Sequence, residues 1–362
     1  MKNERAGASY AVNPTPRAIH GRGAASQPTN RFENISYEAD ADAFDPDAPL
    51  PRTQFLRDTT ASIITYNTSP DIGFDASVNP YRGCEHGCAY CYARPYHEYL
   101  GFSAGLDFET KIVVKENAPE LLRRELASPK WKPQMIAMSG VTDCYQPIER
   151  KLKITRGCLE VLAECRNPVG IVTKNFLVTR DADLLGELAR LNASLVLLSI
   201  TTLDADLARK LEPRTAPPRK RLEAISALAK AGVPVGVNVA PVIPGLTDHE
   251  MISIVKAAKD AGAQFAGYTA LRLPYAVKDL FAEWLTQHFP QRKEKVLAFV
   301  RDMRGGKLND ANFGSRMRGE GVWSEQLAKM FRLAKRKAKL GDFPDLSTEH
   351  FRRPSGAQLE ML

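Results

Sequence analysis

The chain has 362 residues, of which 44% are hydrophobic and 25% are charged, and these proportions are typical of a globular protein with an ample core. Lysine and arginine outnumber aspartate and glutamate by 50 to 42, so the formal net charge of +8 tilts the expectation toward anionic partners without specifying one. The chain has no apolar run of about 18 residues, no signal-peptide core and only six cysteines, which argues against a membrane span and a disulfide scaffold, so we expect a cytoplasmic protein with reduced thiols.

The first segment, residues 1–50, predicts a disordered leader. It carries an Asn-Pro-Thr-Pro piece, an acidic run over residues 38–42 and little apolar periodicity. A flexible leader is the simpler interpretation of this composition, and a docking arm for a partner or a nucleic acid is the alternative.

Over residues 55–275, short apolar runs alternate with longer helical patterns. The runs are short, rich in β-branched residues and flanked by Pro, Gly or Asn, as buried parallel strands are; they lie at 76–78, 135–138, 169–172, 195–198, 233–239 and 265–271. Apolar spacing of three and four predicts helices between them, at 117–127, 150–165, 181–191, 219–231 and 248–261. We therefore expect an α/β fold, a partial (β/α)6 TIM-like barrel of parallel strands, with its chemistry at the carboxyl ends of the strands.

Residues 276–362 predict a helical carboxyl-terminal extension. Residues 276–304 predict one or two helices, and residues 323–339 predict another that carries a row of lysines and arginines. A solvated helix face is the simpler interpretation of these charges, and a nucleic-acid contact is the alternative.

A cysteine cluster follows the first predicted strand. Cys84, Cys88 and Cys91 lie within eight residues in a C-x3-C-x2-C spacing. A structural zinc site normally takes four Cys or His ligands in two separated pairs, so His86 or His97 would have to complete it. A ferredoxin-type cluster takes four cysteines, and a disulfide with a free thiol does not suit the cytoplasm. Three buried structural cysteines are a further interpretation, which so polar and glycine-rich a loop does not favour.

Three thiolates on a cube of four irons leave one iron open to a small molecule that carries an amine and a carboxylate. S-adenosylmethionine is such a molecule, and an electron from the cluster breaks its carbon–sulfur bond to give a 5′-deoxyadenosyl radical. With Tyr90 directly before the last cysteine, the spacing resembles that of the radical S-adenosylmethionine (radical SAM) superfamily. Gly83 and Gly87 permit the tight turns that bring three sulfurs to one cluster.

Within that superfamily, residues 55–275 look most similar to the spore photoproduct lyase-related group, several of whose members have no assigned substrate. The likeness rests on segments 79–84, 142–147 and 173–175. It implies an enzyme, with a lyase among the reactions it allows, that uses a [4Fe-4S] cluster on the three cysteines, S-adenosylmethionine, and an electron donor such as flavodoxin or ferredoxin. The substrate and the oligomeric state stay open; a nucleic-acid substrate is the photoproduct-lyase-like option and agrees with the positive charge.

The resemblance also implies a cofactor site at the carboxyl ends of the strands. Many relatives carry a Gly-Gly-Glu segment after the second strand, where this chain has residues 139–143, so backbone carbonyls and hydroxyls are expected to receive the methionine amino group. Lys174 is expected to pair with the methionine carboxylate and Arg214 to act as a second clamp, with ordinary surface charges as the alternative for both. The remaining contacts are expected with the ribose or carboxylate from Ser199, and with the adenine and its ribose from Tyr90, Ile243 and Leu273. The full set is Tyr90, Ser139, Gly140, Thr142, Lys174, Ser199, Arg214, Ile243 and Leu273.

Cys144 and Tyr145 are the candidate catalytic residues, because they follow the second strand at the predicted barrel mouth. A thiol or a phenol there can give a hydrogen atom to a product radical, and packing is the alternative for Cys144. Two other function classes stay open. One is an electron carrier or other metal-binding protein without radical chemistry, for which Cys144 would have to supply a fourth ligand. The other is a nucleic-acid-binding module with a structural cluster.

Overall fold

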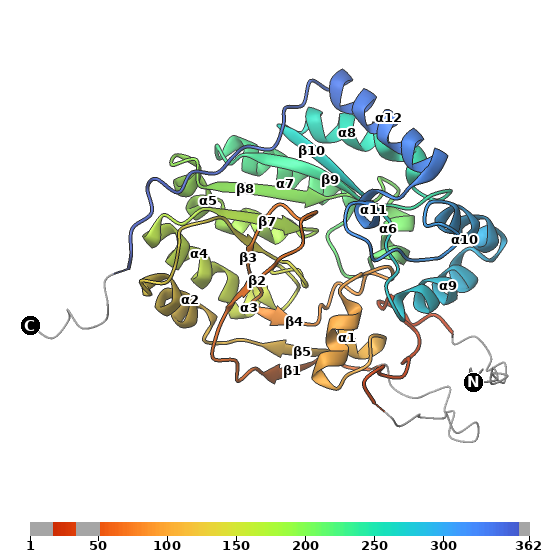
Figure 1. Ribbon diagram of the computed structural model, residues 1–362, viewed down its shortest axis with the longest axis horizontal. Coiled ribbons are helices and arrows are strands. Elements are labelled where there is room, and N and C mark those ends of the chain that lie inside the picture. Colours follow the sequence, from red (N-terminus) through yellow and green to blue (C-terminus); the bar gives the residue numbers. More distant parts are fainter. Residues whose placement is uncertain (1–16, 34–50, 355–362) are drawn as a thin grey trace, which may run out of the picture.

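A seven-stranded sheet forms the centre of the computed structural model, which describes residues 17–33 and 51–354 (Figure 1). Its strand order is β10-β9-β8-β7-β6-β3-β2, and all neighbours from β3 to β10 are parallel, while β2 runs antiparallel to β3. The strands are β2 (Ile64–Tyr66), β3 (Ala76–Val78), β6 (Ile136–Met138), β7 (Val169–Thr173), β8 (Ser194–Ser199), β9 (Val235–Val242) and β10 (Phe265–Ala270). The parallel strands are those predicted from the sequence, so the predicted α/β partial barrel is confirmed.

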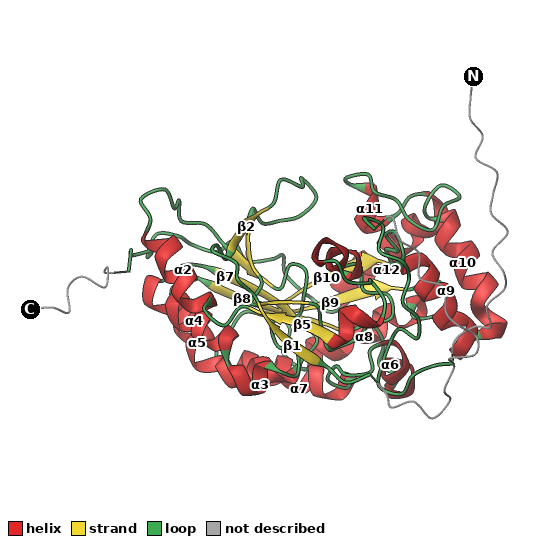
Figure 2. Cartoon of the chain, turned by 90° about the horizontal axis from the view of Figure 1, so that it is seen from below, coloured by secondary structure: helices red, strands yellow, loops and turns green. Residues whose placement is uncertain are grey.

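Helices connect the parallel strands and cover one side of them. Apolar stripes at helical spacing pack α5 against β8, α7 against β8 and β9, and α8 against β9, and Figure 2 shows α3, α5 and α7 along this side of the sheet. The predicted helix over 150–165 is divided in two at Lys153, whose φ is +55°. The helices are α2 (Ala118–Ala127), α3 (Glu149–Leu152), α4 (Ile154–Cys165), α5 (Ala182–Ala189), α6 (Ala205–Leu211), α7 (Pro218–Lys230) and α8 (Met251–Asp260), with short helical turns at η3 (Phe176–Asp181) and η4 (Asp248–Glu250).

A small second sheet, which the sequence did not predict, carries the start of the cysteine loop. It has the order β1-β5-β4, with β1 (Gln54–Arg57), β5 (Lys111–Val114) and β4 (Tyr81–Arg82). Because β4 pairs with β5 and ends one residue before Gly83, this sheet fixes where the loop leaves the barrel. Two short helices, η2 (Arg94–Leu100) and α1 (Leu106–Thr110), follow the loop.

The carboxyl-terminal part is helical, as predicted. Its elements are α9 (Val277–His288), η5 (Pro290–Arg292), α10 (Lys293–Asp302), α11 (Ser315–Arg318) and α12 (Gly321–Lys337). Helix α12 packs on α8 (Figure 1). One hydrophobic cluster contains Cys88, Tyr90 and side chains of α9 and α10, so these helices pack against the cysteine loop. The predicted domain boundary near residue 275 stays a prediction. None of the helices in the described ranges has the length and apolarity that crossing a bilayer requires.

Part of the predicted leader lies against the barrel. Residues 1–16 and 34–50 are outside the described residues, but residues 17–33 run past α1 and η2 and bond to both. The Gln27 amide donates to Asp107, and the Asn30 amide donates to the carbonyl of Glu98. The polar groups of this stretch thus find partners on the folded chain, and the predicted leader over residues 1–50 stays a prediction.

Candidate active site

The cysteine loop lies between β4 and η2 and is largely buried. Cys84 and Cys88 are each 7% exposed, and Cys91 is half-buried. Cys91 packs against two hydrophobic clusters, one that contains Cys84 and one that contains Cys88. Gly83 and Gly87, with φ of +77° and +63°, make the left-handed turns that the sequence predicted for this loop.

The donor set fits an iron–sulfur cluster in its chemistry. Burial raises the pKa of all three thiols, and the pKa of Cys84 is raised further by Asp143, Cys88 and Cys91. A metal cluster binds thiolates, so these three thiols would release their protons when a cluster binds, and its positive charge would then replace them. In the described part of the chain no three or more His, Cys, Asp or Glu side chains are already drawn together closely enough to hold a metal ion, so the fit rests on the donor types and their shared loop.

A buried arginine holds the backbone of this loop. The Arg94 guanidinium is fully buried, and its Nε and Nη2 atoms donate to the Cys88 carbonyl at 3.1 and 2.9 Å. The same guanidinium is paired with Glu109, which is also fully buried. Glu109 in turn accepts from the backbone amides of Gly23 and Ala24, at 3.1 and 2.9 Å. The amino-terminal segment is therefore linked to the cysteine loop through one charged pair.

Gly23 lies so close to this loop that no other residue fits there. A Cβ atom at Gly23 would stand 1.7 Å from the Gly87 carbonyl oxygen and 2.9 Å from the Ala89 nitrogen. Both of these are backbone atoms that cannot move without moving the loop. Residues 22–24 thus form part of the wall around the cysteines.

Asp143, after β6, binds the loop through His86. Its carboxylate accepts from the Thr173 hydroxyl and from the Lys174 amide, each at 2.8 Å, and faces His86 Nδ1 at 3.3 Å. Asn175 Oδ1 accepts from Leu177, so its amide nitrogen faces His86 Nε2 at 3.1 Å and donates to it. Both ring nitrogens of His86 are therefore engaged, which removes the candidate zinc ligand considered from the sequence.

The second histidine of that interpretation, His97, has a different environment. Its ring is 1% exposed and lies between Phe102 and Phe108, and burial lowers its pKa to about 4. His97 therefore packs among aromatic rings next to Gly83, and this packing explains why the residue is there.

Glu212 is the centre of a second polar network at the carboxyl ends of β8 and β9. This buried carboxylate accepts from the hydroxyls of Tyr90 and Thr201 and is ion-paired with the buried Arg221. Lys174 Nζ lies 3.5 Å from Glu212 Oε1 and donates to the Ala240 carbonyl at 2.9 Å. Burial acts to raise the pKa of Glu212, but Arg221 and Lys174 outweigh it and lower that pKa to about 2. Two cations thus converge on one ionised carboxylate.

The segment after β6 lies beside the cysteine loop. The Asn79 side chain accepts from the Val141 amide at 3.0 Å, and the Tyr92 hydroxyl donates to the Gly140 carbonyl at 2.8 Å. Ser139, Gly140 and Thr142 are all half-buried, so their polar groups border both the loop and solvent. These candidate residues and the cysteines therefore lie at the same end of the sheet.

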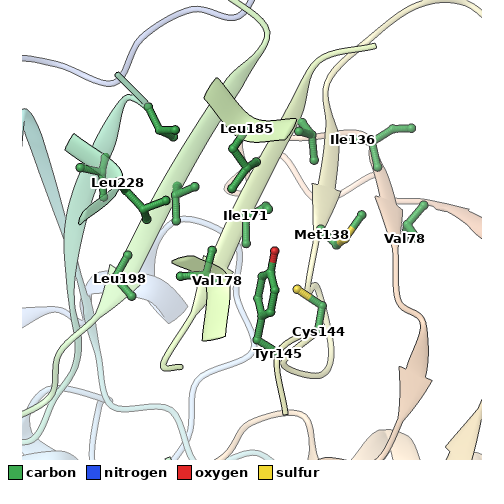
Figure 3. Close-up of a cluster of buried hydrophobic side chains, with 14 of the residues drawn as sticks. Val78, Ile136, Met138, Cys144, Tyr145, Ile171, Val178, Leu185, Leu198 and Leu228 are labelled. Atoms are coloured by element: carbon green, nitrogen blue, oxygen red, sulfur yellow. The ribbon is translucent and has the colours of Figure 1, made fainter. Parts of the chain in front are cut away.

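Cys144 and Tyr145 occupy the hydrophobic core instead of an open mouth. Both are 0% exposed, and Figure 3 shows their side chains among Met138, Ile171 and Val178. The Tyr145 hydroxyl donates to Asp181 at 3.1 Å, and the Cys144 amide donates to the Ser139 hydroxyl. The chain turns inward directly after Asp143, because the Asp143 carboxylate accepts from the Tyr145 amide. This placement is that of packing residues.

The other predicted contact residues lie near the loop in different surroundings. Arg214 is paired with Glu85 of the loop at 3.1 Å, so its guanidinium holds the loop and is not a free carboxylate clamp. Ser199 is buried at the end of β8, where its carbonyl accepts from Arg221. Ile243 and Leu273 are fully buried in the hydrophobic cluster that contains Cys88 and Tyr90.

Three charged residues of the site were missed from the sequence: Arg94, Glu109 and Glu212. Each lies in a segment with no catalytic motif, and each becomes important because folding buries it beside a partner distant in the chain. In the segment around Glu212 the sequence analysis named Arg214 and not Glu212, and the clamp role of Arg214 stays a prediction.

If the chain has the iron–sulfur cluster and the S-adenosylmethionine cleavage that the sequence predicts, replacing Cys144 with alanine is expected to leave both intact. Removing one buried sulfur costs about 1 kcal/mol of stability, in the range for deleting a small buried group. The check is iron content and 5′-deoxyadenosine yield in the reconstituted variant. A fall in iron content would make Cys144 a fourth ligand and support the electron-carrier interpretation.

Comparison with protein families finds one match. A family model described as the radical SAM superfamily matches residues 78–258, from the end of β3 to α8. The matched region holds the three cysteines, Asp143, Lys174 and Glu212.

Two curated relatives are similar in sequence. The uncharacterized protein Rv2578c of Mycobacterium tuberculosis is 38% identical over 220 residues, which are 60% of this chain and 65% of that protein. The uncharacterized protein MJ0683 of Methanocaldococcus jannaschii is 33% identical over 175 residues, 48% of this chain and 63% of that protein. The match therefore spans somewhat less than two thirds of the length of these relatives.

Among solved structures, the fold is similar to that of a spore photoproduct lyase complexed with dinucleoside spore photoproduct. The TM-score is 0.57 at 16% sequence identity, and the match covers 78% of this chain and 79% of that one. At this identity the likeness concerns the fold.

Proposed function

Because this chain belongs to the radical SAM superfamily, we propose that it holds a [4Fe-4S] cluster on Cys84, Cys88 and Cys91 and cleaves S-adenosylmethionine reductively. The observation that carries the proposal is the cysteine loop itself: three thiols, two buried and one half-buried, on one loop with two tight turns, at the carboxyl ends of parallel strands. When bound, the cluster supplies an electron to S-adenosylmethionine, which then yields the 5′-deoxyadenosyl radical.

The residues around the loop support a binding role for the methionine part of the cofactor. Lys174 is turned toward the loop end of β9, where its ammonium has one carbonyl and a shared carboxylate as partners. Lys174 and Arg221 share the single carboxylate of Glu212, so this network has one positive charge in excess, which favours an incoming carboxylate. The carbonyls and hydroxyls of residues 139–142 suit an amino group.

The apolar residues near Cys88 support exclusion of water. Ile243 and Leu273 are buried with Tyr90 in one cluster, and we propose that they form the wall against the adenine and ribose. The Tyr90 hydroxyl is held by Glu212, which fixes the ring next to the loop. A dry wall protects a carbon radical from side reactions. We also propose that Ser199 lies near the methionine carboxylate. The proposed compartment is the cytoplasm.

We propose a nucleic acid as the substrate class and a lyase-type reaction, with an electron donor such as flavodoxin or ferredoxin. The support is the net charge of +8 and the similarity in fold to a photoproduct lyase whose structure holds a dinucleoside photoproduct. An electron carrier without radical chemistry is the competing class.

The test is the release of 5′-deoxyadenosine from anaerobically reconstituted full-length protein with dithionite and S-adenosylmethionine. We expect wild type to release 5′-deoxyadenosine. In Lys174→Met we expect the affinity for S-adenosylmethionine to fall about tenfold or more, because a charge-assisted bond to a carboxylate is lost. Lys220→Met is the matched control, since Lys220 is an exposed lysine paired with Glu223. An intact cluster that releases no 5′-deoxyadenosine would leave the electron-carrier interpretation.

A further inference from the structure

Five aromatic side chains lie exposed next to one another beside the cysteine loop. They are Phe32, Tyr92, Tyr96, Tyr99 and Tyr275, here called the aromatic surface, and their exposed fractions run from 43% for Tyr92 to 67% for Tyr99. The rings of Tyr99 and Phe32 are 4.8 Å apart between centroids, and those of Tyr96 and Tyr99 are 6.4 Å apart. Exposed rings in such number mark an interaction site, since isolated exposed apolar residues are ordinary but a group is not.

A cation ties the amino-terminal segment and the loop after β10 into this surface. The Arg31 guanidinium stands 3.8 Å from the ring centroid of Tyr275, 4.7 Å from that of Phe32 and 5.4 Å from that of Tyr99. It is also paired with Glu98 at 3.1 Å, which holds it in place. The rings from three separate parts of the chain thus form one surface.

The aromatic surface begins at the proposed active site. Tyr92 follows Cys91 directly, and its hydroxyl donates to the Gly140 carbonyl in the segment proposed for S-adenosylmethionine. A molecule that lies on these rings therefore reaches the end of the sheet where the cysteines are.

An arginine with an unused donor accompanies the rings. The Arg272 guanidinium stands 5.4 Å from the centroid of Tyr92, and its Nε atom is buried without a hydrogen-bond partner among the described residues. Burial lowers its pKa and Arg316 lowers it further, while Asp71, which is paired with Arg316, acts in the opposite direction. A buried donor without an acceptor is stabilised by an incoming anion.

From these contacts we infer that the aromatic surface binds single-stranded nucleic acid and leads it to the active site. The inference rests on the proposed function, because it names the substrate class for that same site. A nucleic acid carries flat bases and anionic phosphates, which suit exposed rings and a guanidinium whose Nε atom lacks a partner among the described residues. The bases of a single strand are free to stack on tyrosines, whereas those of a duplex are covered by their neighbours. The net charge of +8 favours the same polyanion.

The test is fluorescence anisotropy of a labelled oligothymidylate with the reconstituted full chain, at two salt concentrations. We expect tighter binding of the single strand than of a duplex of equal length or of thymidine monophosphate. Tyr99→Ala with Tyr275→Ala is expected to weaken binding about tenfold or more, because two stacking rings are lost. Arg272→Gln is expected to weaken it and to lower the slope of affinity against salt by about one.

Two control variants keep the test specific. Tyr99→Phe keeps the ring and is expected to keep the affinity, and Phe55→Ala removes a 47% exposed ring of β1 without effect. An unchanged circular dichroism spectrum establishes that the double variant is folded. Equal affinity for duplex, or an unchanged Kd in the folded double variant, would overturn the inference. A third outcome would also overturn the inference: wild type does not bind the oligonucleotide, and the double variant is no longer reduced by flavodoxin. That result would assign the surface to the electron donor.

The same samples separate this inference from the proposed function. Protein that releases 5′-deoxyadenosine but does not bind oligothymidylate contradicts the aromatic surface alone. Protein that binds through Tyr99 and Tyr275 but releases no 5′-deoxyadenosine supports the surface and contradicts the radical chemistry.

Discussion

Replacing Cys88 with alanine is expected to abolish the iron–sulfur cluster and the cleavage of S-adenosylmethionine together. The Cys88 thiol is one of three donors on a single loop, and two thiols cannot hold a cube of four irons. The backbone of the loop should survive, because Arg94 binds the carbonyl of Cys88 and not its side chain. The measurements are iron and sulfide content after anaerobic reconstitution, expected to fall below about a tenth of wild type, and 5′-deoxyadenosine yield.

Cys158→Ala is the matched control for this variant. Cys158 is also fully buried, but it lies on α4 in the main hydrophobic core. It should keep the full iron content and lose only some stability. Normal iron content in Cys88→Ala would show that the loop is not the cluster site and would contradict the proposed function.

The second large effect is expected from Glu212→Gln, a substitution that keeps the shape of the side chain and removes its charge. Arg221 would then be a buried cation without its counter-ion, and Lys174 would lose its nearest carboxylate. Breaking a buried ion pair by removing one partner costs about 3–5 kcal/mol. We therefore expect a marked fall in the midpoint of urea unfolding.

The same carboxylate predicts a pH dependence of stability. Its pKa is lowered from 4.5 to about 2 in the folded chain, so its contribution is fully present above about pH 4.5 and is lost as the pH falls toward 2. Glu212→Gln cannot titrate and should lose less stability than wild type over this pH window. Urea midpoints at several pH values measure both curves.

Glu223→Gln is the control for this charge. Glu223 is an exposed partner of Arg219 and Lys220 on α7, and such surface pairs contribute about 0–1 kcal/mol. If Glu212→Gln were as stable as Glu223→Gln at neutral pH, the network around Glu212 would not hold this end of the sheet together.

The barrel could be predicted from the sequence because each parallel strand is a local signal. Two examples are short apolar runs between helical patterns, Val169–Thr173 and Ser194–Ser199. A parallel strand that is covered on both faces needs such a run, whichever strands it pairs with. The small sheet of β1, β5 and β4 could not be predicted this way. Its strands are two to four residues long, and β1 is mostly exposed. Although β5 is apolar and buried, nothing local indicates which short strands pair with it.

The cysteines could be predicted because their spacing alone carries the chemistry, whereas the charged residues around them depend on long-range contacts. Glu212 meets Tyr90 across more than a hundred residues, and Glu109 meets Gly23. The burial of Cys144 also depends on such contacts. Its position after a strand predicted a mouth residue, but bonds at Asp143 turn the chain into the core, and its catalytic role stays untested.

The central claim is that the three cysteines of one loop hold a four-iron cluster with one iron left for S-adenosylmethionine. Electron paramagnetic resonance of the reduced, reconstituted protein tests it most directly, with spectra recorded before and after S-adenosylmethionine is added. The account predicts a [4Fe-4S] signal that shifts on addition. A signal that S-adenosylmethionine leaves unchanged, from a cluster whose irons are all ligated by side chains, would contradict it.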